Sequence, residues 1–354
     1  MTPADHAQLQ QHVAAIADIL YRNTPTDQLQ TLEGIEQTWR AQAQQTVLPQ
    51  LGNFFVTAAT QTTAGYPRQV KSILGSLTLT SEQAQRLQLK PRSQLSPLLE
   101  RCCLRVSANV SYQHTAEDIE LLTGIPVSAK TQHRLVHRQS FPAPQASAPV
   151  TEASLDGGTV RLVVKPGQPP RWKQYKAAYL GPGKLYGAWF DDNAALVTWL
   201  NEQPLAKPVT CLGDGHDGIW NLFAQMPPTV ERREVLDWYH LMENLEKVGG
   251  TPQRRRRQAR QLLWQGKVAA TRALFKNCRQ HQAQCFRRYL RKHRVRIPNY
   301  EYLQSEEVCA IGSGGVESTV KQIDQRLKIS GARWEEDNVP QVLAHRCAYL
   351  NKRL

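Results

Sequence analysis

A change of sequence pattern at a proline-rich segment constrains the fold of this chain more than any other feature. Before residue 141 the apolar residues recur mainly at helical spacing, and after residue 150 they fall in the short runs typical of strands. Residues 141–150 between them read F-P-A-P-Q-A-S-A-P-V, with three prolines among small residues, which is typical of a semi-rigid linker. The sequence therefore predicts an all-helical N-terminal region joined to an α/β region.

The α/β region is predicted to contain five strands. They cover Ala153–Val164, Trp172–Leu180, Lys184–Phe190, Val209–Leu212 and Glu231–Tyr239, and a helix begins near Ile219 between the last two. A helix that carries a carboxylate follows later in the chain. Because the order of elements restricts the possible layers, this order predicts an RNase H-like mixed sheet.

Two aspartates lie on these strands at positions suited to a ligand. Asp156 sits within the first strand beside Gly157 and Gly158, and glycines in a strand let a ligand approach the backbone. An aspartate before two glycines is equally typical of an ordinary β-turn. Asp214 sits where the fourth strand passes into the loop G-D-G-H-D-G, and the carboxyl ends of strands in α/β sheets commonly bind ligands.

A third carboxylate, Glu317, is predicted in the first turn of the late helix. Residues 311–334 read I-G-S-G-G-V-E-S-T-V-K-Q-I-D-Q-R-L-K-I-S-G-A-R-W, with helical spacing of the apolar residues after the glycines. Glycines there permit a tight turn with left-handed backbone, and Ser313 or Ser318 is available as the helix cap. Glu317 is therefore a candidate metal ligand. The alternative is a surface ion pair with Lys321, one turn later.

In an RNase H-like sheet Asp156, Asp214 and Glu317 converge at one edge. Like carboxylates at close range resist joint ionisation unless cations join them. Hard oxygen ligands suit Mg²⁺ or Mn²⁺, and two such ions about 3.5–4 Å apart activate a nucleophile and stabilise the leaving oxygen of a phosphodiester. His240, which follows the fifth predicted strand, either supports these ligands or is a structural histidine.

The net charge of +14 points to a polyanionic partner, with nucleic acid favoured over an acidic membrane surface. From Val248 to Asn299 there is no Asp or Glu, and Thr251-Pro252 predicts the start of a helix. Such a one-sided basic segment favours phosphate contact, and pairing of its arginines with acids elsewhere is the structural alternative. The residues expected to contact DNA are Arg254, Arg255, Arg256, Arg257 and Arg260 here, and Lys321, Arg326 and Lys328 on the late helix.

Residues 111–139 predict two helices about a turn. Gly124 supplies the turn, Ser128 caps the second helix, and Lys130, Arg134 and Arg138 lie along that helix. This is the outline of a helix-turn-helix, whose second helix reads the major groove of double-stranded DNA. Ordinary helical hairpins share the pattern, so both interpretations stay open.

The N-terminal residues predict two further helices, one over Ala4–Tyr21 and one from Thr26 past Trp39. The first has an apolar stripe that consists of Leu9, Val13, Ile16, Ala17 and Leu20. Such a stripe is typical of a core or of a contact between subunits, so a homodimer or larger assembly on DNA is expected.

Residues 61–95 are weakly patterned and end in a loop at Lys90-Pro91.

The seven cysteines are scattered and none has the spacing of a zinc site, which suits reduced thiols in a bacterial cytoplasm. No secretory signal and no membrane-spanning run is expected. The predicted parts are residues 1–95 (helical, possible oligomerisation), 96–140 (helix-turn-helix-like), 141–150 (linker), 151–242 with 309–345 (RNase H-like core) and 243–308 (basic helical insertion).

Four motifs resemble the insertion-sequence transposases of the Kra type, which are DDE enzymes with an RNase H-like core and a helical insertion before the Glu. The motifs are L-D-G-G-T, G-D-G-H-D-G-I-W-N, D-W-Y-H-L and G-S-G-G-V-E-S-T-V-K with R-L-K-I-S-G-A-R-W, and the resemblance covers about residues 96–345. It implies that Asp156, Asp214 and Glu317 are the metal-binding triad. Asp156 would bridge two ions, the other two would each complete one, and Asp214 is favoured over Asp217.

The resemblance implies a transposase that cuts DNA at transposon ends and joins the freed 3′-OH to target DNA. Relatives usually carry a cysteine-bearing, finger-like segment ahead of Leu95-Ser96-Pro97, and this chain has none there. The alternatives are a metal-dependent nuclease of the same fold, and a degenerate copy that only binds DNA.

Overall fold

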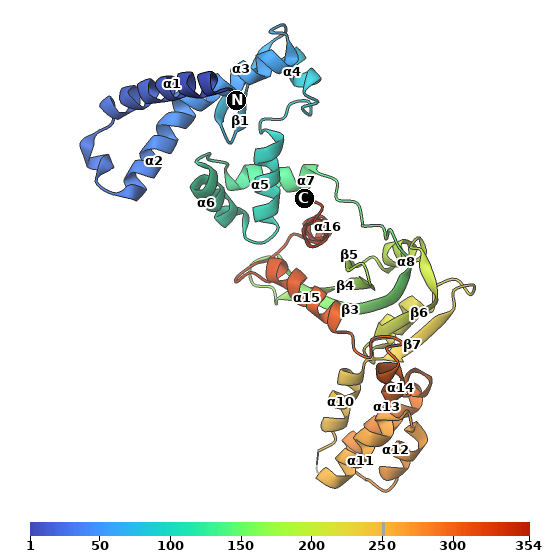
Figure 1. The fold of residues 1–354 in the computed structure, drawn as a ribbon. Helices are drawn as coiled ribbons and strands as arrows, with labels where there is room; N and C mark the ends of the chain where they lie inside the picture. Colours follow the sequence, from blue (N-terminus) through green and yellow to red (C-terminus); the bar gives the residue numbers. More distant parts are fainter. Residues whose placement is uncertain (250–251) are drawn as a thin grey trace. The chain divides into compact units, whose positions relative to one another are not determined.

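The computed structural model describes residues 1–249 and 252–354, which fall into two units (Figure 1). The first unit covers Met1–Leu135 and the second Val136–Leu354. Helix α7 (Ala129–Arg138) crosses from one to the other. The other elements of the first unit are α1 (Pro3–Arg22), η1 (Thr26–Leu29), α2 (Leu32–Gln42), η2 (Ala43–Val47), α3 (Leu48–Thr60), β1 (Pro67–Ser72), β2 (Gly75–Thr80), α4 (Ser81–Arg86), α5 (Pro97–Ser107) and α6 (Tyr112–Thr123).

The first predicted helix is confirmed as α1, and its start follows from a capping box. The Thr2 hydroxyl accepts from the Asp5 N–H at 3.1 Å, while the Asp5 carboxylate accepts from the Thr2 N–H. The second helix was expected from Thr26 but begins at Leu32, because Thr26–Leu29 forms a 3₁₀ turn and the Thr31 hydroxyl caps α2.

The expectation of an all-helical N-terminal region is wrong, because β1 and β2 pair as an antiparallel hairpin. Val70 on β1 and Leu77 and Leu79 on β2 are buried on one face of this hairpin, with polar residues between them. The alternation of Leu77 and Leu79 with polar residues is a strand signal, and its short length hid it among weakly patterned residues.

The predicted pair of helices about Gly124 is present as α6 and α7. Gly124 has a left-handed φ of 73°, and a Cβ there would lie 2.3 Å from the Gln44 side chain. The same Gln44 donates to the Thr123 carbonyl at 2.7 Å, which fixes the turn. The Ser128 hydroxyl accepts from the Thr131 N–H at 3.4 Å, as its predicted capping role requires.

The second unit is a mixed α/β structure. Its elements are β3 (Val150–Leu162), β4 (Arg171–Gly181), β5 (Leu185–Phe190), α8 (Asn193–Asn201), β6 (Leu205–Gly213), α9 (Asp217–Phe223), β7 (Arg232–Leu236), α10 (Trp238–Glu246), α11 (Gln253–Trp264), α12 (Val268–Leu274), α13 (His281–Lys292), η3 (Arg294–Arg296), α14 (Tyr300–Ser305), α15 (Gly314–Leu327), η4 (Glu336–Asn338) and α16 (Val339–Leu350).

The sheet of this unit has, among the described residues, the strand order β5-β4-β3-β6-β7. The pairs β3–β4 and β4–β5 are antiparallel, and β3–β6 and β6–β7 are parallel. Side chains of β3 alternate between two cores: Ala153 and Leu155 belong to one, Val160 and Leu162 to the other. The second core is closed by α15 and α16, which pack on β3, β4 and β5 (Figure 1).

The first core continues from the sheet into the insertion. It contains Leu236 at the end of β7, Leu241 of α10, Leu263 of α11, Phe286 of α13 and Tyr300 of α14. The helices α10 to α14 gather beyond β6 and β7 (Figure 1). The sheet and the insertion are therefore held together by continuous apolar packing rather than by a hinge alone.

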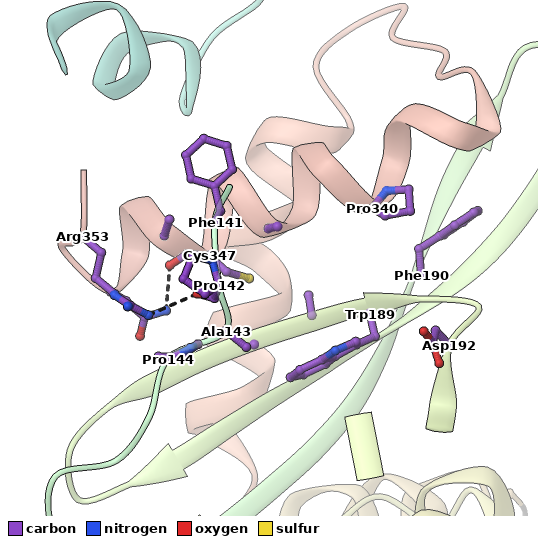
Figure 2. Close-up of a pocket in the computed structure, with 15 residues that line it drawn as sticks. Phe141, Pro142, Ala143, Pro144, Trp189, Phe190, Asp192, Pro340, Cys347 and Arg353 are labelled. Atoms are coloured by element: carbon purple, nitrogen blue, oxygen red, sulfur yellow. Dashed lines mark hydrogen bonds between the residues drawn. The ribbon is translucent and has the colours of Figure 1, made fainter. Parts of the chain in front are cut away.

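The predicted linker is irregular, but its first residues pack on the second unit. Figure 2 shows Phe141 to Pro144 beside Trp189 of β5 and Cys347 of α16. The Arg353 guanidinium donates to the Pro142 carbonyl at 3.1 Å, and the Trp199 indole donates to the Pro144 carbonyl at 2.7 Å. This part of the linker is thus fixed by hydrogen bonds of its own backbone.

The basic insertion begins as a helix, as predicted, since α11 starts at Gln253 directly after Pro252. The proposed cap at Thr251 lies outside the described residues. Arg254 and Arg257 are exposed on α11, whereas Arg255 and Arg256 are half-buried.

Candidate metal centre

Three neighbouring strands bring one aspartate each to the same edge of the sheet. The parallel register pairs Ser154 of β3 with Leu212 of β6, and Gly213 of β6 with Leu236 of β7. Asp156 lies two residues after Ser154 and Asp214 two residues after Leu212, so continuing the register sets them level. Asp237 follows Leu236 as Asp214 follows Gly213. The three carboxylates therefore form a row across β3, β6 and β7.

Asp156 is half-buried within β3, and burial raises the pKa of its carboxyl. Its Oδ1 accepts from the Gly157 N–H at 2.6 Å, which opposes the rise. The negative charges of Asp214 and Glu317 raise this pKa further, and the charge of His240 lowers it. Two of the predicted triad carboxylates thus act electrostatically on the third, and its ionised form would be stabilised by a cation.

The two glycines after Asp156 do not play the same part. A Cβ on Gly158 would lie 2.2 Å from the ring of Tyr175, so this glycine is needed for packing inside the protein. The expectation that it opens the strand to a ligand is wrong. Gly157 is exposed, and a Cβ there would meet the far end of the Lys176 side chain at 2.9 Å. At Gly157, therefore, the close neighbour is a flexible side-chain end that can move aside, whereas at Gly158 it is a buried ring.

Asp214 is held in the loop after β6 by its own neighbours. Its Oδ1 accepts from the His216 N–H at 2.8 Å, and its carbonyl accepts from the Trp220 indole at 2.9 Å. Asp217, the other aspartate of the loop, forms an ion pair of 2.5 Å with Lys292 of α13, whose hydrogen bond lowers the pKa of Asp217. Asp217 is thus occupied, while the second carboxylate oxygen of Asp214 remains for a ligand.

Glu317 lies in the first turn of α15, as predicted. Its Oε1 is 3.1 Å from the hydroxyl of Ser313, and the described residues give it no ion pair with Lys321. Ser313 occupies the cap position but makes no side-chain bond to the helix backbone, and Ser318 lies inside the helix. The expected capping role of either serine is therefore wrong, because Ser313 serves the carboxylates instead.

The glycines at the start of α15 also differ from the prediction, since Gly312, just before the helix, and Gly314 and Gly315, its first two residues, do not have left-handed φ values. Close packing explains two of them. A Cβ on Gly312 would lie 2.6 Å from the ring of Tyr239, and one on Gly315 would lie 2.8 Å from the ring of Tyr179. These glycines let the start of α15 approach the sheet edge.

Asp237, His240 and Glu317 form a compact cluster at this edge. One ligand atom from each lies within 4.8 Å of the other two. His240 Nδ1 is 3.2 Å from Asp237 Oδ1 and 3.7 Å from Glu317 Oε1. This buried nitrogen has no aligned hydrogen-bond acceptor among the described residues, although the short distances mark an ionic contact. The cluster thus has an unsatisfied donor position directed at its carboxylates.

Electrostatics within the cluster favour charged groups. The contact with Asp237 raises the pKa of His240 to about 9, against the effect of burial, and the charges of Glu317 and Asp214 add to the rise. Burial alone would raise the pKa of Asp237, but the donors of His240 and Ser313 hold it below its usual value. Positive charge is therefore stabilised at this point of the sheet edge, from a protonated imidazole or from a metal ion.

Asp237 and His240 were not predicted as site ligands. The fifth strand was expected to run to Tyr239, but it ends at Leu236 and Asp237 caps α10 by accepting from the His240 N–H at 2.7 Å. That error placed Asp237 inside a strand. The signal that identified Asp214, a carboxylate directly after a short buried strand, would have identified Asp237 too.

The donor set fits hard divalent cations in part. The oxygens of Asp156, Asp214, Asp237 and Glu317 suit Mg²⁺ or Mn²⁺. The imidazole of His240 suits Mn²⁺ or other transition ions better than Mg²⁺. Among the described residues only Asp237, His240 and Glu317 bring ligand atoms within 4.8 Å of one another, and neither Asp156 nor Asp214 belongs to such a group. The raised pKa of Asp156 marks a carboxylate whose ionised form a divalent cation would stabilise.

The predicted DNA contacts differ in how far their charges are available. Lys130, Arg134 and Arg138 are exposed at four-residue spacing, so they share one face of α7. Arg326 is only 2% exposed and lies over the Trp334 ring at 4.9 Å, so its expected contact with DNA is wrong. Lys328 pairs with Asp324 at 2.7 Å.

In the run of arginines on α11, Arg256 pairs with Glu246 at 2.8 Å and Arg255 donates to the Cys278 sulfur at 3.0 Å. Glu336, one of the acids that follow the insertion in sequence, pairs with Arg171 and Lys173 on the sheet rather than with this run. The structural alternative thus accounts for one arginine of the run through a different acid.

Comparison with protein-family models gives no match, and comparison with curated proteins gives none either. None of the helices in the described residues is both long and apolar enough to cross a membrane.

Proposed function

We propose that this chain is a DDE-type transposase that cleaves DNA at transposon ends and transfers the freed strand into target DNA. The observation that carries the proposal is the row of Asp156, Asp214 and Asp237 on adjacent strands with Glu317 beside it. Carboxylates in this number, next to a strongly basic helical segment, suit metal-assisted chemistry on a phosphodiester.

The architecture supports an RNase H-like core. Three antiparallel strands followed by two parallel strands give the order β5-β4-β3-β6-β7, with helices on both faces. The insertion between α10 and α15 separates Asp237 from Glu317 in sequence, but their ligand atoms lie within 4.8 Å of each other. The helix pair α6–α7, with Lys130, Arg134 and Arg138 on one exposed face, is assigned to reading DNA as a helix-turn-helix.

Asp156, Asp214 and Glu317 would hold the divalent cations, Mg²⁺ or Mn²⁺. When bound, such ions activate the attacking oxygen and stabilise the leaving oxygen. We assign Asp237 the role of positioning Glu317, because Asp237 accepts a hydrogen bond from Ser313 at the start of α15 and so holds that end of the helix at the sheet edge. His240 holds a proton between Asp237 and Glu317 and limits their mutual repulsion.

The test is cleavage and joining of DNA with the triad variants Asp156→Asn, Asp214→Asn and Glu317→Gln. Each substitution is expected to abolish cleavage, that is, to lower its rate by several powers of ten, because activation by bound metal lowers the reaction barrier by several kcal/mol. DNA affinity should be largely kept. Asp217→Asn is the matched control in the same loop and should cut at close to the normal rate.

Three outcomes separate the candidate activities. Joined products support a transposase, and cuts without joining would mean a nuclease of the same fold. Binding without metal-dependent cuts in the unaltered protein would mean a chain that acts only by binding DNA. Near-normal cleavage by any one triad variant would remove that residue from the site.

A further inference from the structure

The insertion contains an open hollow of about 670 Å³ between α12 and α13 that is lined by cations and uncharged groups. Its lining does not include the arginine run on α11, although Arg255 of that run donates to the sulfur of Cys278 in the lining. The residues that line it are Arg272, Lys276, Asn277, Cys278, Arg279, Gln284, Arg287, Arg288 and Arg291, called here the α12–α13 cleft.

The charges of this cleft are not neutralised within the described chain. None of its six cations forms an ion pair with a carboxylate of a described residue, and residues 248–299 contain no Asp or Glu. The Nε atoms of Arg272 and Arg287 are buried and have no hydrogen-bond partner among the described residues. Folding thus gathers like charges whose repulsion a bound anion would relieve.

Hydrogen bonds within the protein hold two arginines of the cleft in fixed orientations. Arg287 of α13 donates at 3.3 Å to the carbonyl of Lys276, which lies in the segment that follows α12. Arg288 donates to the Cys285 sulfur at 3.2 Å. Each keeps further N–H groups for a ligand, because a guanidinium carries five donors.

The chemistry of the lining selects the ligand class. Six cations in one hollow call for a polyanion rather than a single carboxylate. The lining has no aromatic side chain on which a base could stack, and stacking is how proteins hold single strands. The phosphates of a duplex need only donors and positive charge. We propose that the α12–α13 cleft binds the phosphodiester backbone of double-stranded DNA, independently of sequence.

This proposal rests on the proposed function for the identity of the polyanion. It differs from the expectation for α11, where Arg255 and Arg256 already bond inside the protein and Arg254, Arg257 and Arg260 are exposed on the helix surface. Because Arg254, Arg257 and Arg260 are themselves expected to contact DNA, the matched control of equal charge uses Lys165, Lys184 and Lys207, which are exposed and lie outside the segments expected to bind DNA.

The experiment measures binding of the full chain to a plain duplex of random sequence at several salt concentrations, with metal chelated so that no cleavage occurs. One variant carries Lys276→Gln, Arg288→Gln and Arg291→Gln, and the control carries Lys165→Gln, Lys184→Gln and Lys207→Gln. Each lowers the net charge by three, from +14 to +11. Three lost phosphate contacts should lower the slope of log K against log salt by about 2.7, or roughly 500-fold in affinity at 0.1 M salt.

A larger loss of slope in the cleft variant than in the control supports the cleft. Equal losses would mean that net charge alone acts, and an unchanged slope would mean that the cleft does not hold DNA. Either result overturns the proposal and leaves the proposed function standing. If the unaltered protein binds vesicles of anionic lipid but not the duplex, the cleft proposal is also overturned. A cleft variant that loses slope, in a protein that never cuts DNA, would keep the cleft and remove the transposase. Melting curves of both variants check that each is folded.

Discussion

The hydroxyl of Ser313 donates to Oδ2 of Asp237 at 2.8 Å, although 76 residues separate the two. The Ser313 N–H donates to the same oxygen, and the Trp238 N–H donates to the Ile311 carbonyl at 2.9 Å. These bonds join the end of β7 to the start of α15. Glu317 therefore takes its place at the sheet edge from the strand that precedes the insertion.

Replacing Ser313 with Ala should weaken this connection. Loss of a hydrogen-bond donor to a buried carboxylate lowers the free energy of unfolding by about 1–3 kcal/mol. Loss of a group that orients metal ligands typically costs 10–100-fold in metal affinity or activity, so DNA cleavage should fall by about that factor. Ser318→Ala, on the exposed face of the same helix, should change neither quantity. Denaturant unfolding and cleavage rates measure both, and equal behaviour of the two variants would contradict the role of Ser313.

Tyr289 on α13 leads to a prediction of the opposite sign. Its hydroxyl is buried and has no hydrogen-bond partner among the described residues, and burial with the charges of Asp214 and Asp237 raises its pKa. Removing an unsatisfied hydroxyl should leave stability unchanged or improve it by about 1 kcal/mol. Thermal unfolding of Tyr289→Phe against Tyr302→Phe, an exposed control, tests this. A clear loss of stability would show that the hydroxyl has a partner.

The ring of Tyr289 also fixes the loop that carries Asp214. A Cβ on Gly215 would lie 2.3 Å from this ring, which is inside any tolerable contact. Gly215→Ala should therefore displace α13 or the loop and cost roughly 1–3 kcal/mol. Tyr289→Ala is itself destabilising because its ring packs on the core, but the double variant should lose less stability than the sum of the two single losses, because the clash is removed. Additive losses would mean that the loop, rather than the ring contact, sets the cost.

His293 predicts a dependence of stability on pH. It is fully buried, and burial with the charges of Lys292 and Arg296 lowers its pKa to about 4. Below pH 6.5 the unfolded chain takes up a proton at this residue while the folded chain does not, so its contribution is complete above pH 6.5 and is lost as pH falls towards 4. The loss amounts to roughly 3 kcal/mol. Unfolding measured from pH 7.5 to 4.5 should be less pH-dependent in His293→Asn, whereas His6→Asn, on exposed α1, should keep the dependence of the unaltered protein.

The N-terminal helix predicts an assembly. No residue of α1 is buried, and Leu9, Val13 and Ile16 are exposed by 39–55% along one face. An isolated helix of this kind gains little stability from its own sequence, since helices in proteins are stabilised mainly by packing of an apolar face. We expect a second copy of the chain to cover it on DNA. Val13→Glu with Ile16→Glu should reduce the mass of the DNA-bound complex in light scattering.

The control for this assembly is Gln11→Glu with Ala15→Glu, which adds the same charge to the opposite face of α1. It should keep the mass of the unaltered complex. A monomeric complex of the unaltered protein would exclude the assembly altogether.

Sequence patterns predicted the sheet well because its strands are bounded by strong signals. The alternation in residues 153–164, the Gly-Pro-Gly turn and the loop after Leu212 each mark a strand end, and the structure departs from them by a few residues. The hairpin of β1 and β2 was missed because each of its strands is six residues long and lies among polar residues. Short elements depend on tertiary packing that local patterns do not contain.

The residues of the candidate site likewise divide into those that local sequence patterns predicted and those that they missed. Asp156, Asp214 and Glu317 could be named because each stands next to a recognisable boundary of a strand or helix. Asp237 was hidden by a strand drawn three residues too long, and the bond between Asp237 and Ser313 spans the whole insertion. No spacing rule links residues at such a separation, since their proximity depends on how the insertion folds back.

If the chain cuts DNA as proposed, the continuous core between sheet and insertion has a consequence for the position of the cut. Because Leu236, Leu241, Leu263 and Phe286 belong to one apolar cluster, the insertion cannot swing freely against β6 and β7. A duplex bound by the insertion would then be held at a fixed distance from the carboxylates. The position of a cut would be set by that distance from the bound segment of DNA, and not by the base sequence at the cut itself.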